Sequence, residues 1–181
     1  MIKCFKIFIL SFLMFSCENS MNDIQRVTFK EGSPDEVIKD FHITFVDSGY
    51  SKVDIYSKIT EVYHKPISLT KFKDSVRVNF FSYEGVLVST LSAHYGQISF
   101  SEGKMFVRDS VRLYNLKKKQ TLETESLYWN QKDSSIYTNS SVIVKTPKAY
   151  FYGEGIKTNQ EFSSYTFIKP KGTFKINKLE D

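Results

Sequence analysis

Residues 76–80 read Val76-Arg77-Val78-Asn79-Phe80, with apolar and polar side chains in strict alternation. Because successive side chains of a β-strand point to opposite faces, this pattern predicts a strand with one buried face and one solvated face. Alternation of the same kind returns in Leu91-Ser92-Ala93-His94-Tyr95 and in Val111-Arg112-Leu113-Tyr114, and a short apolar run follows at Val142-Ile143-Val144. The 16 Phe and 11 Tyr also favour strands. We therefore expect an all-β protein.

Turn-forming residues separate these runs at intervals of roughly 10 to 20 residues, as expected of serial antiparallel hairpins. Phe41, Ile43 and Phe45 alternate with polar residues and precede Gly49, which predicts a first strand that ends in a turn. Only residues 35–39 suggest a helical turn. The turns predicted further along the chain are 83–85, 101–103, 116–119, 130–133 and 169–172.

An internal repeat underlies the hairpins. Leu91-Ser92-Ala93 and Asp109-Ser110-Val111 return 31 residues later as Leu122-Glu123-Thr124 and Ser140-Ser141-Val142, and Lys73-Asp74-Ser75-Val76 echoes Arg108-Asp109-Ser110-Val111. A repeated β-unit cannot bury its apolar face alone, so successive units should stack around one continuous interior. The repeat predicts a single elongated roll of strands over residues 36–176, with an open or groove-like interior, rather than a compact barrel.

The N-terminus has the pattern of an export signal. Lys3 and Lys6 accompany an apolar run from Phe5 to Phe15, which ends at Ser16-Cys17. A membrane-spanning helix needs about 20 apolar residues, and this run has roughly half that length. We expect a lipoprotein signal peptide over residues 1–16, a lipidated Cys17 with a flexible tether to residue 35, and a C-terminal tail over 177–181. The alternative is an ordinary signal peptide cut elsewhere, which would leave Cys17 as a lone thiol.

Charge and cysteine content exclude several classes of protein. Lys3 and Lys6 leave with the signal, so 23 of the 25 basic residues remain against 20 acidic ones. This near balance does not indicate a nucleic-acid partner, and Lys117-Lys118-Lys119 fits a solvated hairpin tip. Cys4 leaves with the signal and Cys17 would carry lipid, so the folded body should contain neither disulfides nor a catalytic cysteine.

The sequence offers no pattern typical of a catalytic or metal site. His42, His64 and His94 lack the spacing of metal ligands, and no Gly-x-Ser-x-Gly motif occurs. Glu123 and Glu125 share one face of a predicted strand, where solvation explains them. Gly153-Glu154-Gly155 fits a bend or bulge, because no helical pattern follows it. We predict no enzymatic activity, no metal and no cofactor.

Four motifs in order resemble those of a known family. They are Leu91-Ser92-Ala93-His94-Tyr95-Gly96, Leu122-Glu123-Thr124-Glu125-Ser126-Leu127-Tyr128-Trp129, a Thr-Asn-x-x-Val step from Thr138 to Val142, and Gly153-Glu154-Gly155-Ile156. Over about residues 35–175 the chain resembles LptC, the periplasmic component of the lipopolysaccharide export machinery, and related LptA and LptD-like domains share the motifs. LptC proteins in well-known cases have an N-terminal membrane helix, whereas this chain has the shorter run described above.

The resemblance implies a twisted antiparallel β-jellyroll with an apolar interior. This interior would take lipopolysaccharide acyl chains from an inner-membrane ABC transporter and pass them to an LptA-like jellyroll. It also implies a periplasmic location, with a lipid anchor in the inner membrane. The transporter should dock near residues 41–60 and the next jellyroll near residues 150–176. The residues expected at these partner edges are Phe41, Ile43, Phe45, Phe151, Tyr165 and Phe167.

Alternation predicts which side chains point inward, but a packed core and a lipid-binding groove share this pattern. Trp129, for example, fits either the mouth of a groove or a core position where a backbone carbonyl accepts its N–H. The alternatives to lipid transfer are a structural or assembly lipoprotein with a packed β-sandwich core, and an enzyme on a β-sandwich. The predicted groove residues are Val76, Val78, Phe80, Leu91, Ala93, Val111, Leu113, Leu122, Leu127, Trp129, Ile136, Val142, Val144 and Ile156.

Overall fold

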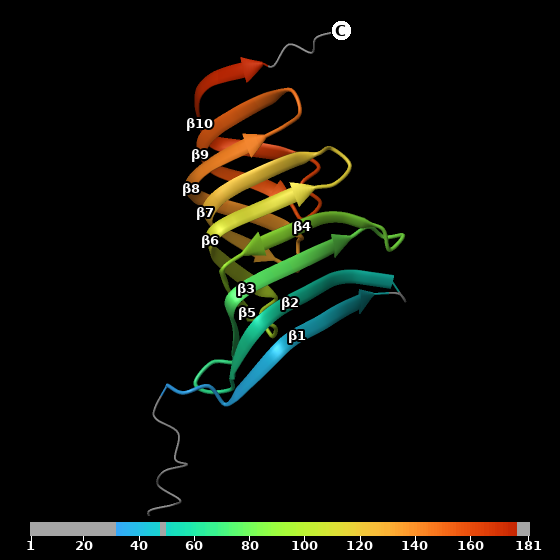
Figure 1. Ribbon diagram of the computed structural model, residues 1–181, viewed down its shortest axis with the longest axis vertical. Helices are drawn as coiled ribbons and strands as arrows, with labels where there is room; N and C mark the ends of the chain where they lie inside the picture. The colour runs from blue at the N-terminus through green and yellow to red at the C-terminus, as the bar shows by residue number, and fades with distance from the viewer. Residues whose placement is uncertain (1–31, 48–49, 177–181) are drawn as a thin grey trace, which may run out of the picture. The chain divides into compact units, whose positions relative to one another are not determined.

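The computed structural model describes residues 32–47 and 50–176, so the predicted signal, Cys17 and the C-terminal tail lie outside the described residues. Residues 34–47 and 50–176 form one compact unit made of strands in a single antiparallel sheet (Figure 1). This confirms the predicted all-β fold. None of the described residues forms a helix long and apolar enough to cross a membrane. The strands are β1 Glu36–Asp47, β2 Tyr50–Tyr63, β3 Leu69–Phe81, β4 Leu87–Ala93, β5 Tyr95–Ser99, β6 Lys104–Asn115, β7 Gln120–Asn130, β8 Ser135–Lys145, β9 Ala149–Asn159 and β10 Tyr165–Ile176.

The sheet bends into two arms. The first part of β3, Thr70–Phe72, pairs with β5, whereas Val76–Phe81 pairs with β4. Strand β6 also pairs with both β4 and β5. In the sequence, the single residue His94 separates β4 from β5. Arm A contains β4 and the segments paired in line with it, which include 76–81 of β3, 111–115 of β6, 120–124 of β7 and 141–145 of β8. Arm B contains β5 and the segments in line with that strand, which include 70–72 of β3, 104–108 of β6, 126–130 of β7 and 135–137 of β8. We call the side where the free ends of the two arms approach each other the mouth.

The repeated motifs mark the bend between the arms. Strand pairing shifts register between Arg108 and Val111 and again between Thr138 and Ser141. Asp74, Asp109 and Ser110 have positive φ values of 72°, 69° and 57°. Aspartate tolerates this left-handed region better than β-branched residues do, and bulges increase the local bend of a strand. Gly155 continues the series with a φ of 71° and lies opposite the register shift between Thr138 and Ser141. The extra residue of this bulge is on β8, so of the bend or bulge predicted at Gly153-Glu154-Gly155 the structure shows the bend.

Apolar side chains from both arms fill the interior. In arm A one cross-strand row runs through eight strands, from β1 to β9, and its members between the two edges are at most 1% exposed. Aromatic pairs connect the arms at the mouth: ring centroids lie 5.6 Å apart for Phe45 and Phe100, and 5.3 Å apart for Phe80 and Trp129. The row consists of Ile43, Ile55, Val78, Leu91, Leu113, Leu122, Val144 and Phe151.

Two local predictions were wrong. Residues 36–39 form no helical turn, because they pair with Ile59–Val62 of β2 and begin β1. Residues 169–172 form no hairpin turn, because Lys169–Lys171 pair with β9 inside strand β10. In both places pairing with a neighbouring strand outweighs the local preference of the sequence. The predicted turns near residues 83–85, 101–103, 116–119 and 130–133 are confirmed.

The positive φ of Asp74 at the bend leads to a testable prediction about stability. Replacement by valine should lower the free energy of unfolding by about 1–2 kcal/mol, because a β-branched residue is disfavoured at positive φ. Replacement by glycine should leave stability nearly unchanged, since glycine adopts this conformation without strain. Urea unfolding of both variants measures the difference. Equal losses would show that the Asp74–Lys58 ion pair, at 3.5 Å, matters instead of the backbone conformation.

Candidate functional site: the interior and its two edges

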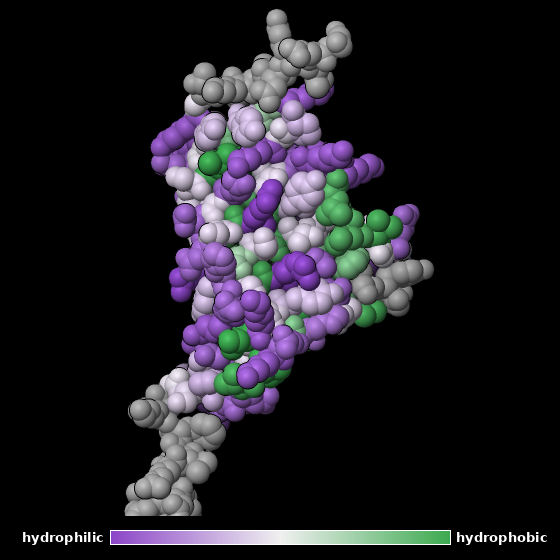
Figure 2. Space-filling model, in the orientation of Figure 1, coloured by the Kyte–Doolittle hydropathy of each residue, from purple (hydrophilic) through white to green (hydrophobic). Residues whose placement is uncertain are grey.

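The fold brings the predicted groove residues together in one apolar cluster. All fourteen lie on the inner faces of the two arms and are between 0 and 6% exposed. The interior is therefore filled by side chains in this structure. The outer face of the strands is mainly hydrophilic by contrast (Figure 2). Core residues that the prediction omitted are Val53, Ile55, Phe72, Ile98, Met105, Val107, Ala149 and Phe162.

Most of the omitted residues could have been found from the sequence. Ile98, Met105 and Val107 continue the same alternation on β5 and β6. Phe162 is different, because it lies in the connection between β9 and β10 and no periodic pattern surrounds it.

At the N-terminal end, β1 exposes part of the interior. Phe41, Ile43 and Phe45 are partly buried and pack against the core. The Phe41 ring centroid lies 5.8 Å from that of Phe72. Among the described residues β1 has β2 as its single partner strand, so its outer edge presents unpaired backbone groups. An added strand would cover this edge and extend the apolar row that begins at Ile43.

At the C-terminal end, β10 forms the opposite edge, with β9 as its single partner strand among the described residues. Tyr165 makes edge-to-face contacts with Phe151 and Phe167, with ring centroids 6.4 and 5.8 Å apart. Burial raises the pKa of the Tyr165 phenol. These three rings help to line a cavity of about 370 Å³. The space beside the last strands is thus apolar and accessible.

A charged pair lies on the outer side of this edge. The Lys171 ammonium on β10 donates a hydrogen bond to the Glu154 carboxylate on β9 and lowers the pKa of that carboxyl group. The two residues connect the last two strands beside the cavity, and both are exposed enough for salt to screen the pair.

Two polar side-chain atoms in the interior lack a hydrogen-bond partner among the described residues, the Trp129 Nε1 and the Thr60 Oγ1. Trp129 is 2% exposed and Thr60 is fully buried. Buried donors without partners are rare in folded proteins. Within residues 32–47 and 50–176 no backbone carbonyl accepts the Trp129 N–H, which contradicts that alternative, and the ring contacts Phe80 at the mouth.

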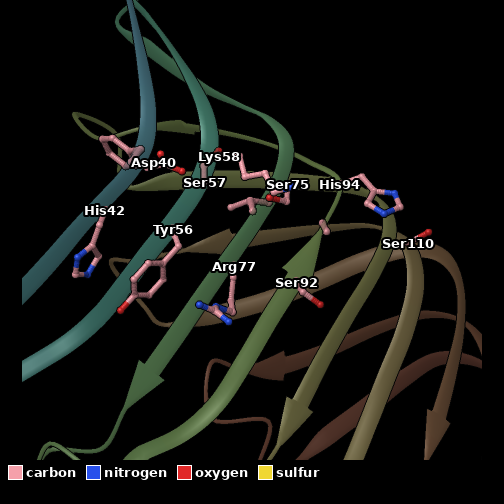
Figure 3. A pocket seen from close by; sticks show the side chains of 13 residues that line it. Asp40, His42, Tyr56, Ser57, Lys58, Ser75, Arg77, Ser92, His94 and Ser110 are labelled. Atoms are coloured by element: carbon pink, nitrogen blue, oxygen red, sulfur yellow. The ribbon is translucent and has the colours of Figure 1, made fainter.

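A separate cleft of about 520 Å³ lies beside the bend, lined by polar side chains together with Phe41, Val76 and Ala93 (Figure 3). His42 stacks on Tyr56 with ring centroids 4.3 Å apart, and the Arg77 guanidinium lies 5.0 Å from the centre of the Tyr56 ring. Burial raises the pKa of Tyr56, and the nearby Asp54 carboxylate raises it further. His94 lines the same cleft, whereas His64 lies elsewhere and donates from its backbone N–H to Asp35. The residues described here hold no group of three or more His, Cys, Asp or Glu side chains placed to bind a metal ion.

Comparison with known protein families agrees with the fold and the interior. A family model described as "Lipopolysaccharide-assembly, LptC-related" matches residues 5–170, which is most of the chain. No curated protein matches the chain. Proteins of this family act in lipopolysaccharide transport in the periplasm, in association with the inner membrane. The bent antiparallel sheet, its apolar interior and the family match all agree, and the chain belongs to the LptC family of lipopolysaccharide-assembly proteins.

Proposed function

We propose that the roll takes up the acyl chains of lipopolysaccharide from an inner-membrane ABC transporter and passes them to an LptA-like jellyroll. The observation that supports this most is the apolar row in arm A, which runs from Ile43 on β1 to Phe151 on β9. Transfer of acyl chains from water to such a surface gains about 0.8 kcal/mol for each buried methylene. The protein can therefore hold lipid without any chemical step.

The two edge strands are the proposed docking sites. Phe41, Ile43 and Phe45 on β1 would meet the transporter, and Phe151, Tyr165 and Phe167 on β9 and β10 would meet the next jellyroll. Strand addition at either edge satisfies unpaired backbone groups and places two apolar interiors in line. The partly exposed inward side chains at both edges support this arrangement. Lipid on Cys17 would anchor the chain to the inner membrane.

Photocrosslinking in cells tests the lipid path. We expect a benzophenone amino acid at Phe151 or Phe167 to form adducts with lipopolysaccharide, because both side chains face the C-terminal cavity. Phe41 should give adducts with transporter subunits. Tyr137, which lies on the outer face of β8 and is 41% exposed, is the matched control and should give neither.

The filled interior favours a second candidate, a structural or assembly module without lipid cargo. This candidate predicts protein adducts at Phe41 and Phe167 without lipopolysaccharide adducts at any inward position. That result, in a folded protein, would replace the lipid-transfer proposal.

A further inference from the structure

The connection between β9 and β10, which we call the 160–164 loop, crosses the mouth and is held by side chains of arm A. Four consecutive backbone carbonyls of the loop each accept a hydrogen bond from a different side chain of the opposite arm. The donors are Ser89 Oγ to Gln160, Asn115 Nδ2 to Glu161 at 2.7 Å, Gln120 Nε2 to Phe162, and Lys118 Nζ to Ser163.

Three of these donors are unusual for their position. Ser89, Asn115 and Gln120 are neighbours across β4, β6 and β7, and they continue the inward row that contains Val53 and Phe80. They are at most 6% exposed. An inward, buried row is normally apolar, so polar side chains there need partners. Their partners are the carbonyls of the 160–164 loop, so these polar residues hold the loop across the mouth.

Phe162 lies at the centre of the loop and fills interior space. Its side chain is 0% exposed, and its ring centroid lies 5.6 Å from that of Tyr165, which lines the C-terminal cavity. Its φ of 50° is in the left-handed region, which is unfavourable for an aromatic residue. Such a conformation persists only where surrounding contacts hold it. The hydrogen bonds from arm A supply those contacts.

We propose that the 160–164 loop is a latch, and that the Phe162 ring occupies in the unloaded protein the space that an acyl chain takes in the loaded one. This inference rests on the proposed lipid transfer and adds the place where the acyl chain enters the interior. When the loop opens, water can replace the donors of its carbonyls, while the acyl chain replaces the apolar contacts of Phe162. Because the Phe162 ring and the acyl chain are both apolar, either can fill this space, and the loop can open and close reversibly.

The test measures how fast the full-length protein takes up cis-parinaric acid, whose fluorescence rises in apolar surroundings, and purified lipopolysaccharide. Ser89→Ala and Gln120→Leu each remove one donor to the loop. We expect uptake roughly three- to tenfold faster in each, the change that loss of one hydrogen bond produces. Phe162→Ala removes the proposed occupant and should tighten binding about tenfold. Gln97→Leu makes the same change as Gln120→Leu on the outer row of β5, where Gln97 pairs with Phe106, and should leave uptake unchanged.

A second readout does not depend on any variant. Hydrogen exchange of the wild-type protein should show faster exchange at residues 160–164 when lipopolysaccharide is bound, because the Phe162 N–H would lose its bond to the Asn159 carbonyl, now 2.9 Å long. Wild-type uptake rates in Ser89→Ala and Gln120→Leu, wild-type affinity in Phe162→Ala and unchanged exchange in the loop would together overturn the latch and leave lipid transfer intact. If neither the wild type nor any variant bound either probe, the proposed function would fail as well.

Discussion

Replacement of Trp129 by alanine is expected to lower the free energy of unfolding by about 3–5 kcal/mol, the loss typical of a buried aromatic ring. Trp129 is 2% exposed and makes an edge-to-face contact with Phe80, with centroids 5.3 Å apart. This contact joins β7 of arm B to β3 of arm A across the mouth. Its loss should leave a cavity between the arms that neighbouring side chains fill only in part.

Trp129→Phe separates ring burial from hydrogen bonding. The Trp129 Nε1 lacks a partner among the described residues, so removal of this donor should not itself destabilise the protein. We expect a loss of less than about 1.5 kcal/mol, as for other swaps that keep most of a buried side chain. Urea unfolding followed by circular dichroism measures both variants, with Tyr137→Ala on the outer face as control. If phenylalanine proved as harmful as alanine, a partner for the indole N–H would have to exist.

Replacement of Gly153 by alanine is expected to separate β10 from β9 and to abolish the docking proposed at the C-terminal edge. A Cβ at this position would lie 2.5 Å from Phe167 Cδ1 and 2.9 Å from the backbone oxygen of Lys169. Because one of these atoms belongs to the backbone, the clash can be relieved only by movement of β10. We expect a stability loss of at least about 1–3 kcal/mol, as for other overpacked sites.

Gly96→Ala is the matched control for the Gly153 variant. The nearest atoms to a Cβ at Gly96 are side-chain carbons of Val76, Phe72 and Val107, at 3.1 to 3.3 Å. This variant should lose some stability through repacking but keep the β9–β10 pair. Crosslinking from Phe167 to an LptA-like partner measures docking in both proteins. A Gly153 variant that still docked would show that β10 is not the edge that the partner uses.

The bend between the arms could be predicted from the sequence only in part. The repeat built on Asp109-Ser110 and Ser140-Ser141 was visible in the sequence, and it predicted stacked units with a shared interior. That these motifs form the corners of a bent sheet required the strand pairing, because β4 and β5 pair with different parts of β3. Phe41, Phe45 and Phe167 were expected at partner edges from alternation and the family resemblance, and the structure places them on β1 and β10, the two ends of the strand order.

The sequence by itself determined that the chain is all-β, which side chains point inward, and which family it resembles. The first two conclusions follow from the period of two along a strand, which is a local property of the chain. The resemblance rests on the four sequence motifs and their order. The tertiary structure alone decided that the interior is filled and that the 160–164 loop, with Phe162, crosses the mouth. Both depend on contacts between residues far apart in the chain, such as Asn115 with Glu161 and Phe80 with Trp129. Alternation assigns a side chain to a face, but only the distance between two faces decides whether the space between them is occupied.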